Sequence, residues 1–186
     1  MIKTAIFLAD GFEEVEGLTV VDMLRRAGIP IDMVSITGKK EVTGSHHITV
    51  TADCLIESLP FEEYSYLILP GGMPGTKNLE ACKTLTDQLT YFAENGKHVA
   101  AICAAPSVLG HLGILKGKKA CCYPSFEKEL TGADVSFDRA VTDGNVITSR
   151  GLGTAIHFAS AIIADINGKD AAGEIEQAIV YESQLK

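Results

Sequence analysis

Short apolar runs of strand length alternate along this chain with segments in which apolar residues recur at helical spacing. The apolar runs are continuous rather than alternating, which is typical of strands that are buried on both faces of a parallel sheet. Strands are predicted over 2–8, 31–36, 66–69, 98–102, 119–122 and 146–149. Helices are predicted over 15–26, 85–92, 106–113 and 154–166, and a glycine lies at or shortly after the end of each.

A short hairpin over 41–43 and 47–51 interrupts this order, because polar and apolar residues alternate there with a period of two. The remaining alternation of strands and helices predicts an α/β fold, namely a flavodoxin-like three-layer sandwich with a mostly parallel sheet and helices on both faces. The chain of 186 residues shows no internal repeat or linker, so we expect a single domain over 1–186.

Candidate functional residues follow three of the predicted strands. Acidic residues are frequent in 10–16, a Pro-Gly-Gly turn lies at 70–72, and Cys103 follows the strand 98–102. In open parallel sheets, ligands bind at the carboxyl ends of the strands, near the point where the strand order reverses. We therefore expect these three segments to meet at one rim of the sheet.

Cys103 lies where a predicted strand turns into a helix, and Pro106 suits the first turn of that helix. A side chain at such a turn is pushed out of the sheet, and the N–H groups of the helix start favour the thiolate. An activated cysteine nucleophile has these properties. The alternative is a buried cysteine that acts as a small hydrophobic residue, which this segment alone does not exclude.

Three glutamates surround the start of the first predicted helix. Carboxylates at this end stabilise a helix, so Glu13 and Glu14 need no other function. Glu16 lies one helical turn beyond Glu13, and we expect its side chain to point inward over the rim. A half-buried carboxyl beside a thiol has a raised pKa and can exchange a proton near neutral pH. The alternative is that Glu16 only stabilises the helix.

Two glycine-containing loops are further candidates. Glycines at 71 and 72 let the backbone approach a ligand and aim N–H groups at an oxyanion, although a simple tight turn is the plainer interpretation. The loop 149–154 is a candidate anion site before a helix, but it lacks the glycine spacing of a dinucleotide-binding motif. The histidines and cysteines lack the spacing of a zinc site, so no metal is predicted.

The chain has 16 basic and 24 acidic residues, and its net charge of −8 removes the positive surface that nucleic-acid binding requires. No stretch approaches the length of a membrane span, and the first apolar run is too short for a signal peptide. The count of five cysteines is odd, so a disulfide framework is not expected. These features predict a cytoplasmic protein with reduced thiols and without nucleic-acid or membrane partners.

Four segments of the chain form a specific pattern. They are Ala-Asp-Gly-Phe-Glu-Glu-Val-Glu at 9–16, Ile-Leu-Pro-Gly-Gly at 68–72, Ala-Ile-Cys-Ala-Ala-Pro at 101–106 and Thr-Ser-Arg-Gly-Leu-Gly-Thr at 148–154. Together they resemble the ThiJ/PfpI superfamily, and most closely the branch of the parkinsonism-associated protein deglycase and its bacterial relatives. The likeness covers essentially the whole chain, in order.

In that branch, the residue matching Cys103 is the nucleophile and the oxidation-sensitive thiol. The acid matching Glu16 is a protonated partner that hydrogen-bonds the sulfur. The resemblance also implies a homodimer with the sites near its interface, and a reaction that needs no cofactor. The residues that it implies for binding the substrate or its oxyanion are Gly71, Gly72, Ala104, Tyr123, Arg150 and Gly151.

Two positions depart from related patterns. The protease-like branch has a histidine directly after the cysteine, whereas this chain has Ala104, so peptidase activity is not expected. The deglycase branch often has a histidine where Tyr123 precedes Pro124; Tyr123 can donate a hydrogen bond, but the base-like role of that position stays open. Glutamine amidotransferases require glycines around the cysteine and a late His-x-Glu, and this chain has neither.

The residues and the resemblance together predict a cysteine-dependent enzyme of the glyoxalase or deglycase type, acting on methylglyoxal, glyoxal or their early adducts with proteins. The alternative is an oxidative-stress sensor or a redox-regulated chaperone, in which oxidation of Cys103 alters partner binding. A role in thiazole biosynthesis, which the superfamily name suggests, has no support from individual residues.

Overall fold

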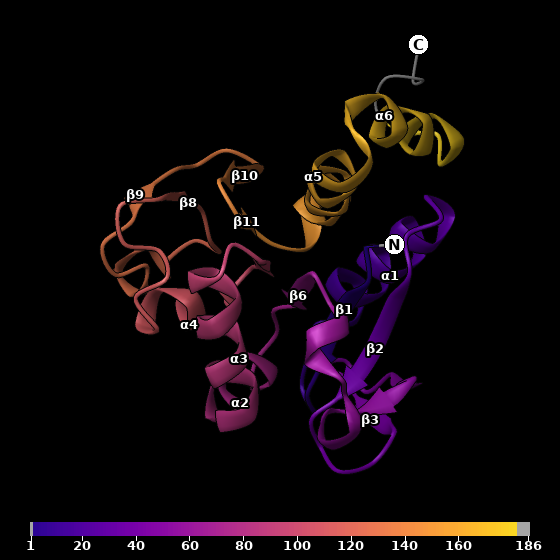
Figure 1. Ribbon diagram of the computed structural model, residues 1–186, viewed down its shortest axis with the longest axis vertical. Helices are drawn as coiled ribbons and strands as arrows, with labels where there is room; N and C mark the ends of the chain where they lie inside the picture. Colours follow the sequence, from indigo (N-terminus) through magenta and orange to yellow (C-terminus); the bar gives the residue numbers. More distant parts are fainter. Residues whose placement is uncertain (1, 182–186) are drawn as a thin grey trace.

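The computed structural model describes residues 2–181 of the chain (Figure 1). A seven-stranded sheet has the order β10-β11-β7-β6-β1-β2-β5. All neighbouring strands are parallel except β10, which is antiparallel to β11 at one edge. The strands are β1 (Thr4–Leu8), β2 (Ile31–Ser35), β5 (Cys54–Leu55), β6 (Tyr66–Leu69), β7 (His98–Ile102), β10 (Ala140–Asp143) and β11 (Val146–Ser149).

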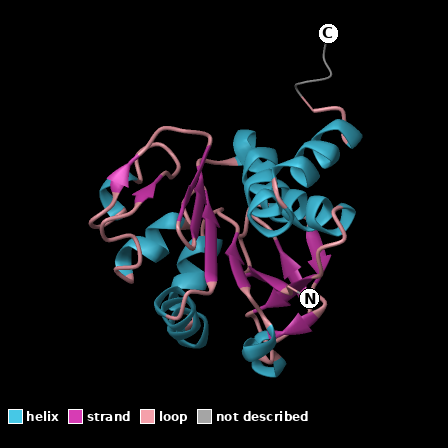
Figure 2. Ribbon diagram, turned by 45° about the horizontal axis from the view of Figure 1, so that its top comes forward, coloured by secondary structure: helices cyan, strands magenta, loops and turns pink. Residues whose placement is uncertain are grey.

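Helices cover both faces of this sheet, as Figure 2 shows. One hydrophobic cluster joins the sheet to α2, α3 and α4, and the other joins it to α1, α5 and α6. The helices are α1 (Glu14–Arg26), α2 (Gly75–Ala81), α3 (Lys83–Glu94), α4 (Pro106–His111), α5 (Ala155–Asn167) and α6 (Lys169–Ala178). The predicted flavodoxin-like α/β sandwich is therefore confirmed.

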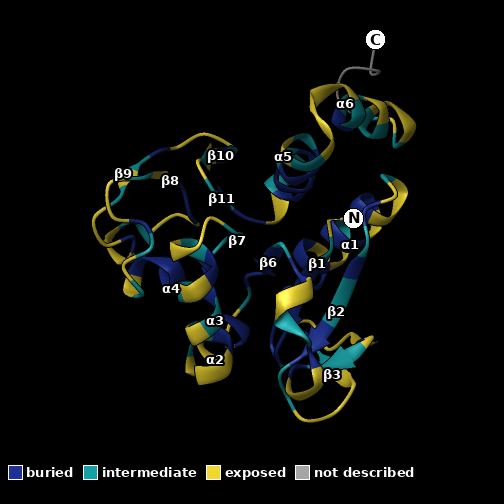
Figure 3. Cartoon of the chain, in the orientation of Figure 1, coloured by how far each residue is buried: buried dark blue, intermediate teal, exposed yellow. Residues whose placement is uncertain are grey.

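The continuous apolar strands are explained by burial on both faces. Along β1, Phe7 packs into the cluster of α2, α3 and α4, and Leu8 packs into the opposite cluster. Because successive side chains of a strand point to opposite faces, both sets must be apolar. The buried residues accordingly follow the strands and the inner sides of the helices (Figure 3). Helix α5 is apolar for the same reason, since it packs against the sheet, α1 and α6.

Smaller elements flank the sheet. The predicted hairpin is present as β3 (Glu41–Thr43) and β4 (Thr49–Thr51), which pair antiparallel apart from the main sheet. A second small sheet joins β8 (Lys119–Ala120) to β9 (Asp134–Val135). In the part of the chain that the structure describes there are also four short 3-10 helices, at η1 (Ile56–Ser58), η2 (Phe61–Glu63), η3 (Glu127–Glu129) and η4 (Leu152–Thr154).

The prediction of a strand over 119–122 is wrong in extent and in place. Only its first two residues pair, and they pair with β9 rather than with the main sheet. The Cys121 N–H instead donates to Thr148 Oγ1 over 3.0 Å. Elements that the sequence pattern did not predict include α2, α6 and β10, each of which follows or precedes a predicted element within a few residues, and the two-residue strands β5 and β9. Among the described residues, no helix is long and apolar enough to cross a membrane.

Candidate active site

Cys103 lies at the sharp turn between β7 and α4, as expected. Its φ of 66° is in the left-handed region, which costs a non-glycine residue about 1–3 kcal/mol. Two hydrogen bonds hold this conformation: the Cys103 N–H donates to the Ser149 carbonyl over 3.0 Å, and the Cys103 carbonyl accepts from the Tyr123 N–H over 2.8 Å. The residue is only partly buried, so it is not a fully packed core cysteine.

Glu16 lies in the first turn of α1 and points inward, as expected, with only 1% of the residue exposed. Its Oε2 accepts a hydrogen bond of 2.9 Å from the Gly71 N–H. The Leu152 N–H is a second backbone donor to this carboxyl, and the Cys103 thiol is its side-chain partner. The structure therefore brings the acid and the sulfur into direct contact.

Gly71 occupies the space between the two side chains. A Cβ atom on Gly71 would fall 2.4 Å from Cys103 Cβ and 2.6 Å from Glu16 Oε2, so a side chain at this position is sterically excluded. Of the three expected backbone donors, Gly72 and Ala104 donate to the sulfur, whereas the Gly71 N–H is taken by Glu16. Gly71 thus supports the carboxyl, and Gly72 and Ala104 surround the thiol.

The thiol and the carboxyl shift each other's ionisation. Burial raises the pKa of Glu16 to about 7, and the nearby charge of Glu13 adds to this rise. Burial also raises the pKa of the Cys103 thiol to about 12, together with the charge of ionised Glu16; the N–H groups of Gly72 and Ala104 oppose the rise without cancelling it. The expectation that this environment lowers the thiol pKa is therefore wrong.

The pair can nevertheless form a thiolate by moving one proton from sulfur to carboxyl. When Glu16 holds the proton, the repelling charge is gone and the carboxyl becomes a hydrogen-bond donor to sulfur. One-proton forms of the pair exist above pH about 7, where the first proton has left. A reactive thiolate therefore requires a protonated Glu16 beside it.

The other expected residues lie around this pair to different degrees. Gly151 separates Tyr123 from Glu16: a Cβ at Gly151 would lie 3.2 Å from the Tyr123 ring and 3.9 Å from Glu16 Oε1. Tyr123 is half exposed beside the site. The Arg150 guanidinium lies over the ring of Phe137, at 5.5 Å, and Arg150 is joined to the pair through its chain neighbour Gly151. The structure thus places Tyr123 and Gly151 at the pair, and Arg150 at its border.

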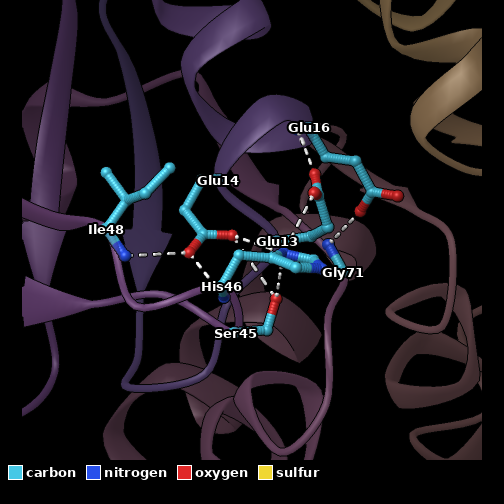
Figure 4. Close-up of polar contacts among 7 residues, drawn as sticks. All are labelled: Glu13, Glu14, Glu16, Ser45, His46, Ile48 and Gly71. Atoms are coloured by element: carbon cyan, nitrogen blue, oxygen red, sulfur yellow. Dashed lines mark hydrogen bonds and ion pairs between the residues drawn. The ribbon is translucent and has the colours of Figure 1, made fainter.

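Glu14 has a role that its place at a helix start did not reveal. Its carboxylate accepts hydrogen bonds from the N–H groups of His46, over 2.7 Å, and Ile48, over 3.4 Å (Figure 4). Burial acts to raise its pKa, but the N–H of Glu14 itself, the His46 ring and these two bonds together outweigh burial and lower the pKa to about 2. Glu14 therefore fixes the turn of the β3–β4 hairpin against α1.

Glu13, Glu14 and His46 also place three potential metal-ligand atoms within 4.8 Å of one another. The carboxylates are already bonded to N–H groups: Glu13 to the N–H of Glu16, and Glu14 to the hairpin turn. Acidic groups that are satisfied in this way do not by themselves indicate a metal site. The cluster is explained as the polar junction between α1 and the hairpin.

The site combines a thiol at a strained strand-to-helix turn with a buried carboxyl at the rim of a parallel sheet. These features define the class of flavodoxin-like sandwich proteins that carry a cysteine at the turn between a strand and a helix. The chain belongs to the DJ-1/PfpI family, whose sequence model matches residues 2–165.

Individual relatives agree with this assignment. The chain is 34% identical to protein dj-1beta of Drosophila melanogaster, over 97% of this chain and 98% of that protein. It is 34% identical to protein DJ-1 homolog B of Arabidopsis thaliana over 96% of this chain, but spans only 41% of that longer protein. The solved structure of oxidized Toxoplasma gondii DJ-1 is similar at a TM-score of 0.93 and 34% identity, covering 97% of this chain and 99% of that one.

The contact of Gly71 with both reactive side chains yields a direct test. We expect Gly71→Ala to separate Glu16 from Cys103 and to slow alkylation of Cys103 at pH 8 by about tenfold or more, because the added Cβ occupies their contact. The matched control is Gly153→Ala, since a Cβ there meets nothing within 4 Å. Iodoacetamide labelling followed by peptide mass spectrometry measures the rate. An unchanged rate in Gly71→Ala would contradict this geometry.

Proposed function

We propose that this chain is a cysteine-dependent, cofactor-independent enzyme of the glyoxalase or deglycase type, acting on methylglyoxal, glyoxal or their early adducts with proteins. The observation that carries the proposal is the contact between the Cys103 thiol and the buried Glu16 carboxyl, with the N–H groups of Gly72 and Ala104 beside the sulfur. Such a pair supplies a nucleophile, a proton carrier and oxyanion donors at one point.

In the first step, the Cys103 thiolate attacks the aldehyde carbon of methylglyoxal and forms a carbon–sulfur bond. The electron pair of the carbonyl moves to its oxygen, which takes the proton from Glu16 and gives a hemithioacetal. The N–H groups of Gly72 and Ala104 lie beside the sulfur and stabilise the developing negative charge. Glu16 leaves this step as a carboxylate and can act as a base.

In the second step, the Glu16 carboxylate removes the hydrogen on the former aldehyde carbon, and an enediolate forms with its negative charge on the former ketone oxygen. Return of this proton to the neighbouring carbon, and transfer of the hydroxyl proton from the former aldehyde oxygen to the former ketone oxygen, gives a thioester of lactate, so the aldehyde carbon is oxidised and the ketone carbon is reduced within one molecule. Water then hydrolyses the thioester and regenerates the thiol. The sum is methylglyoxal plus water to lactate, without an external oxidant or reductant.

A cavity next to the segments that follow Gly72 and Cys103 supports substrates larger than a free dicarbonyl. A cavity of about 380 Å³ lies between α2, α4 and the segment before η3. Its lining includes Met73, which follows the Gly71–Gly72 turn, Ser107 in the first turn of α4, and Ser125, which lies two residues after Tyr123. Ser107 is joined to that site directly, because its Oγ donates to the Ala104 carbonyl over 2.7 Å. The side chain of a protein adduct can extend into this space.

The second candidate function is an oxidative-stress sensor or a redox-regulated chaperone. A protonated Glu16 beside the sulfur can donate a hydrogen bond to a sulfinate on Cys103, which stabilises this oxidation state. The similar structure from Toxoplasma gondii is an oxidized form of that protein. Peptidase activity is not part of the proposal, because Ala104 replaces the histidine that would serve as the base.

We also propose a homodimer in a reducing cytoplasm. Apolar side chains that are 36–53% exposed gather around the first turns of α1, at Val15, Leu18, Ile48 and Leu152. The N–H groups of Ile48 and Leu152 bond to Glu14 and Glu16, which places these residues beside the candidate site. A second copy covering this surface would bring two sites close to the interface. All five cysteines are free thiols, in keeping with a reducing compartment.

Turnover of methylglyoxal tests the proposed reaction. We expect Cys103→Ser to lower lactate formation at least about a thousandfold, since serine supplies no thiolate. Glu16→Gln is expected to lower kcat by about 10²–10⁴-fold, because glutamine can donate a hydrogen bond to sulfur but cannot carry the proton. Cys82→Ser, which removes another partly buried thiol, serves as the control and should retain activity. Lactate formation by folded Cys103→Ser rejects the scheme.

Intact mass after mild peroxide treatment tests the sensor. We expect two oxygen atoms to add at Cys103 in the wild-type protein, and fewer in Glu16→Leu, which cannot donate a hydrogen bond to a sulfinate. Peptide mapping locates the modification. Oxygen addition that first appears at Cys54 or Cys82 argues against a sensor centred on Cys103.

Sedimentation velocity tests the dimer. We expect Leu18→Asp to shift the protein towards a monomer, because a charge at the centre of a buried apolar interface is unpaired. Tyr91→Asp alters a more exposed apolar residue on α3, on the opposite face of the sheet, and should not change the sedimentation coefficient. A wild-type monomer at micromolar concentration would contradict the proposed assembly.

A further inference from the structure

Glu13 lies at the start of α1, and its atoms form hydrogen bonds with both Glu16 and Gly71. Its Oε2 accepts a hydrogen bond of 2.7 Å from the Glu16 N–H. Its own N–H donates to the Gly71 carbonyl over 2.9 Å, and the Gly71 N–H donates to Glu16 Oε2 over 2.9 Å. The three residues therefore close a ring of hydrogen bonds, in which the Glu13 and Glu16 side chains lie beside Gly71 (Figure 4).

The same residue is a buried charge. Glu13 is 8% exposed, and a buried carboxylate disfavours ionisation of a carboxyl beside it. It accordingly adds to the rise that burial causes in the pKa of Glu16. The chief influences on Cys103 are burial, Glu16 and the two backbone donors, so the charge of Glu13 acts mainly on the carboxyl member of the pair.

We infer that Glu13 is a positioning residue for the pair: it fixes the Glu16 backbone and the Gly71 loop, and its charge increases the share of the one-proton form in which Glu16 holds the proton and Cys103 is a thiolate. Moving one proton from Cys103 Sγ to Glu16 conserves the charge of the pair and places the negative charge on sulfur, where Glu13 is not among the chief influences. This inference rests on the proposed function only in taking Cys103 and Glu16 as the reactive centre.

Other titratable groups near the pair are few among residues 2–181. Cys103 faces Glu16 from the turn after β7, and Tyr123 lies beyond Gly151. His46, on the hairpin turn, faces Glu13 with Nδ1 at 3.8 Å from Oε1 and contacts Glu14 at 3.0 Å. The His46 side chain is 68% exposed, so water screens its charge. Repeating each measurement with His46→Gln removes the His46 ring from the comparison.

The pH dependence of Cys103 alkylation by iodoacetamide tests the inference. In the wild-type protein, the rate should rise with a midpoint near pH 7, where the pair loses its first proton. In Glu13→Gln, the midpoint should fall by about one pH unit, because a negative neighbour of the carboxyl is gone. The rate above the midpoint should also fall by about tenfold, since the one-proton form with a thiolate becomes rarer when the carboxyl holds its proton less tightly.

Two further variants separate charge from helix capping. Aspartate and serine are both favourable residues before a helix, so both Glu13→Asp and Glu13→Ser should fold. Glu13→Asp keeps the charge and should resemble the wild-type protein, whereas Glu13→Ser should resemble Glu13→Gln. Glu14→Gln removes a carboxylate from the same helix turn outside the ring of hydrogen bonds, and it should leave the midpoint in place. The ¹³C resonance of the Glu16 carboxyl reports its protonation directly.

The inference is overturned if Glu13→Gln leaves the midpoint and the rate unchanged, if Glu14→Gln shifts both equally, or if Glu13→Asp behaves like Glu13→Ser. These outcomes do not depend on turnover. A shifted midpoint in a protein that converts no dicarbonyl supports the role of Glu13 and rejects the proposed reaction. Normal turnover of the dicarbonyl with an unshifted midpoint in Glu13→Gln supports the proposed reaction and rejects the role of Glu13.

Discussion

The burial of the Glu16 carboxyl against the Cys103 sulfur is the interaction on which the site depends. A carboxylate enclosed to this degree is costly unless hydrogen bonds or a proton compensate for the lost water. The N–H groups of Gly71 and Leu152 provide part of this compensation, and the thiol provides the rest. Because burial brings the pKa of Glu16 to about 7, the proton moves at little cost near neutral pH. The cost of burying an acid thus becomes the source of its reactivity.

The sheet supplies the rigidity that this contact requires. Cys103 holds a strained backbone conformation only because its N–H and carbonyl are bonded to Ser149 and Tyr123. Ser149 ends β11, and β11 pairs with β7, whose residues are buried between two hydrophobic clusters. Gly71 follows β6, the other neighbour of β7. Three adjacent parallel strands therefore position the Cys103 sulfur, the Ser149 carbonyl that holds the Cys103 backbone, and the Gly71 N–H that donates to Glu16.

The sequence pattern predicts those features of the site that depend on neighbouring residues in the chain. The apolar run before Cys103 and Pro106 after it are sufficient to predict the bend, and the spacing from Glu13 is sufficient to place Glu16 inward. The sequence alone favours an ordinary tight turn at Gly71, because the need for glycine there arises from its closeness to the side chains of Glu16 and Cys103. These residues lie 55 and 32 positions away in the chain, so no local pattern reveals the contact.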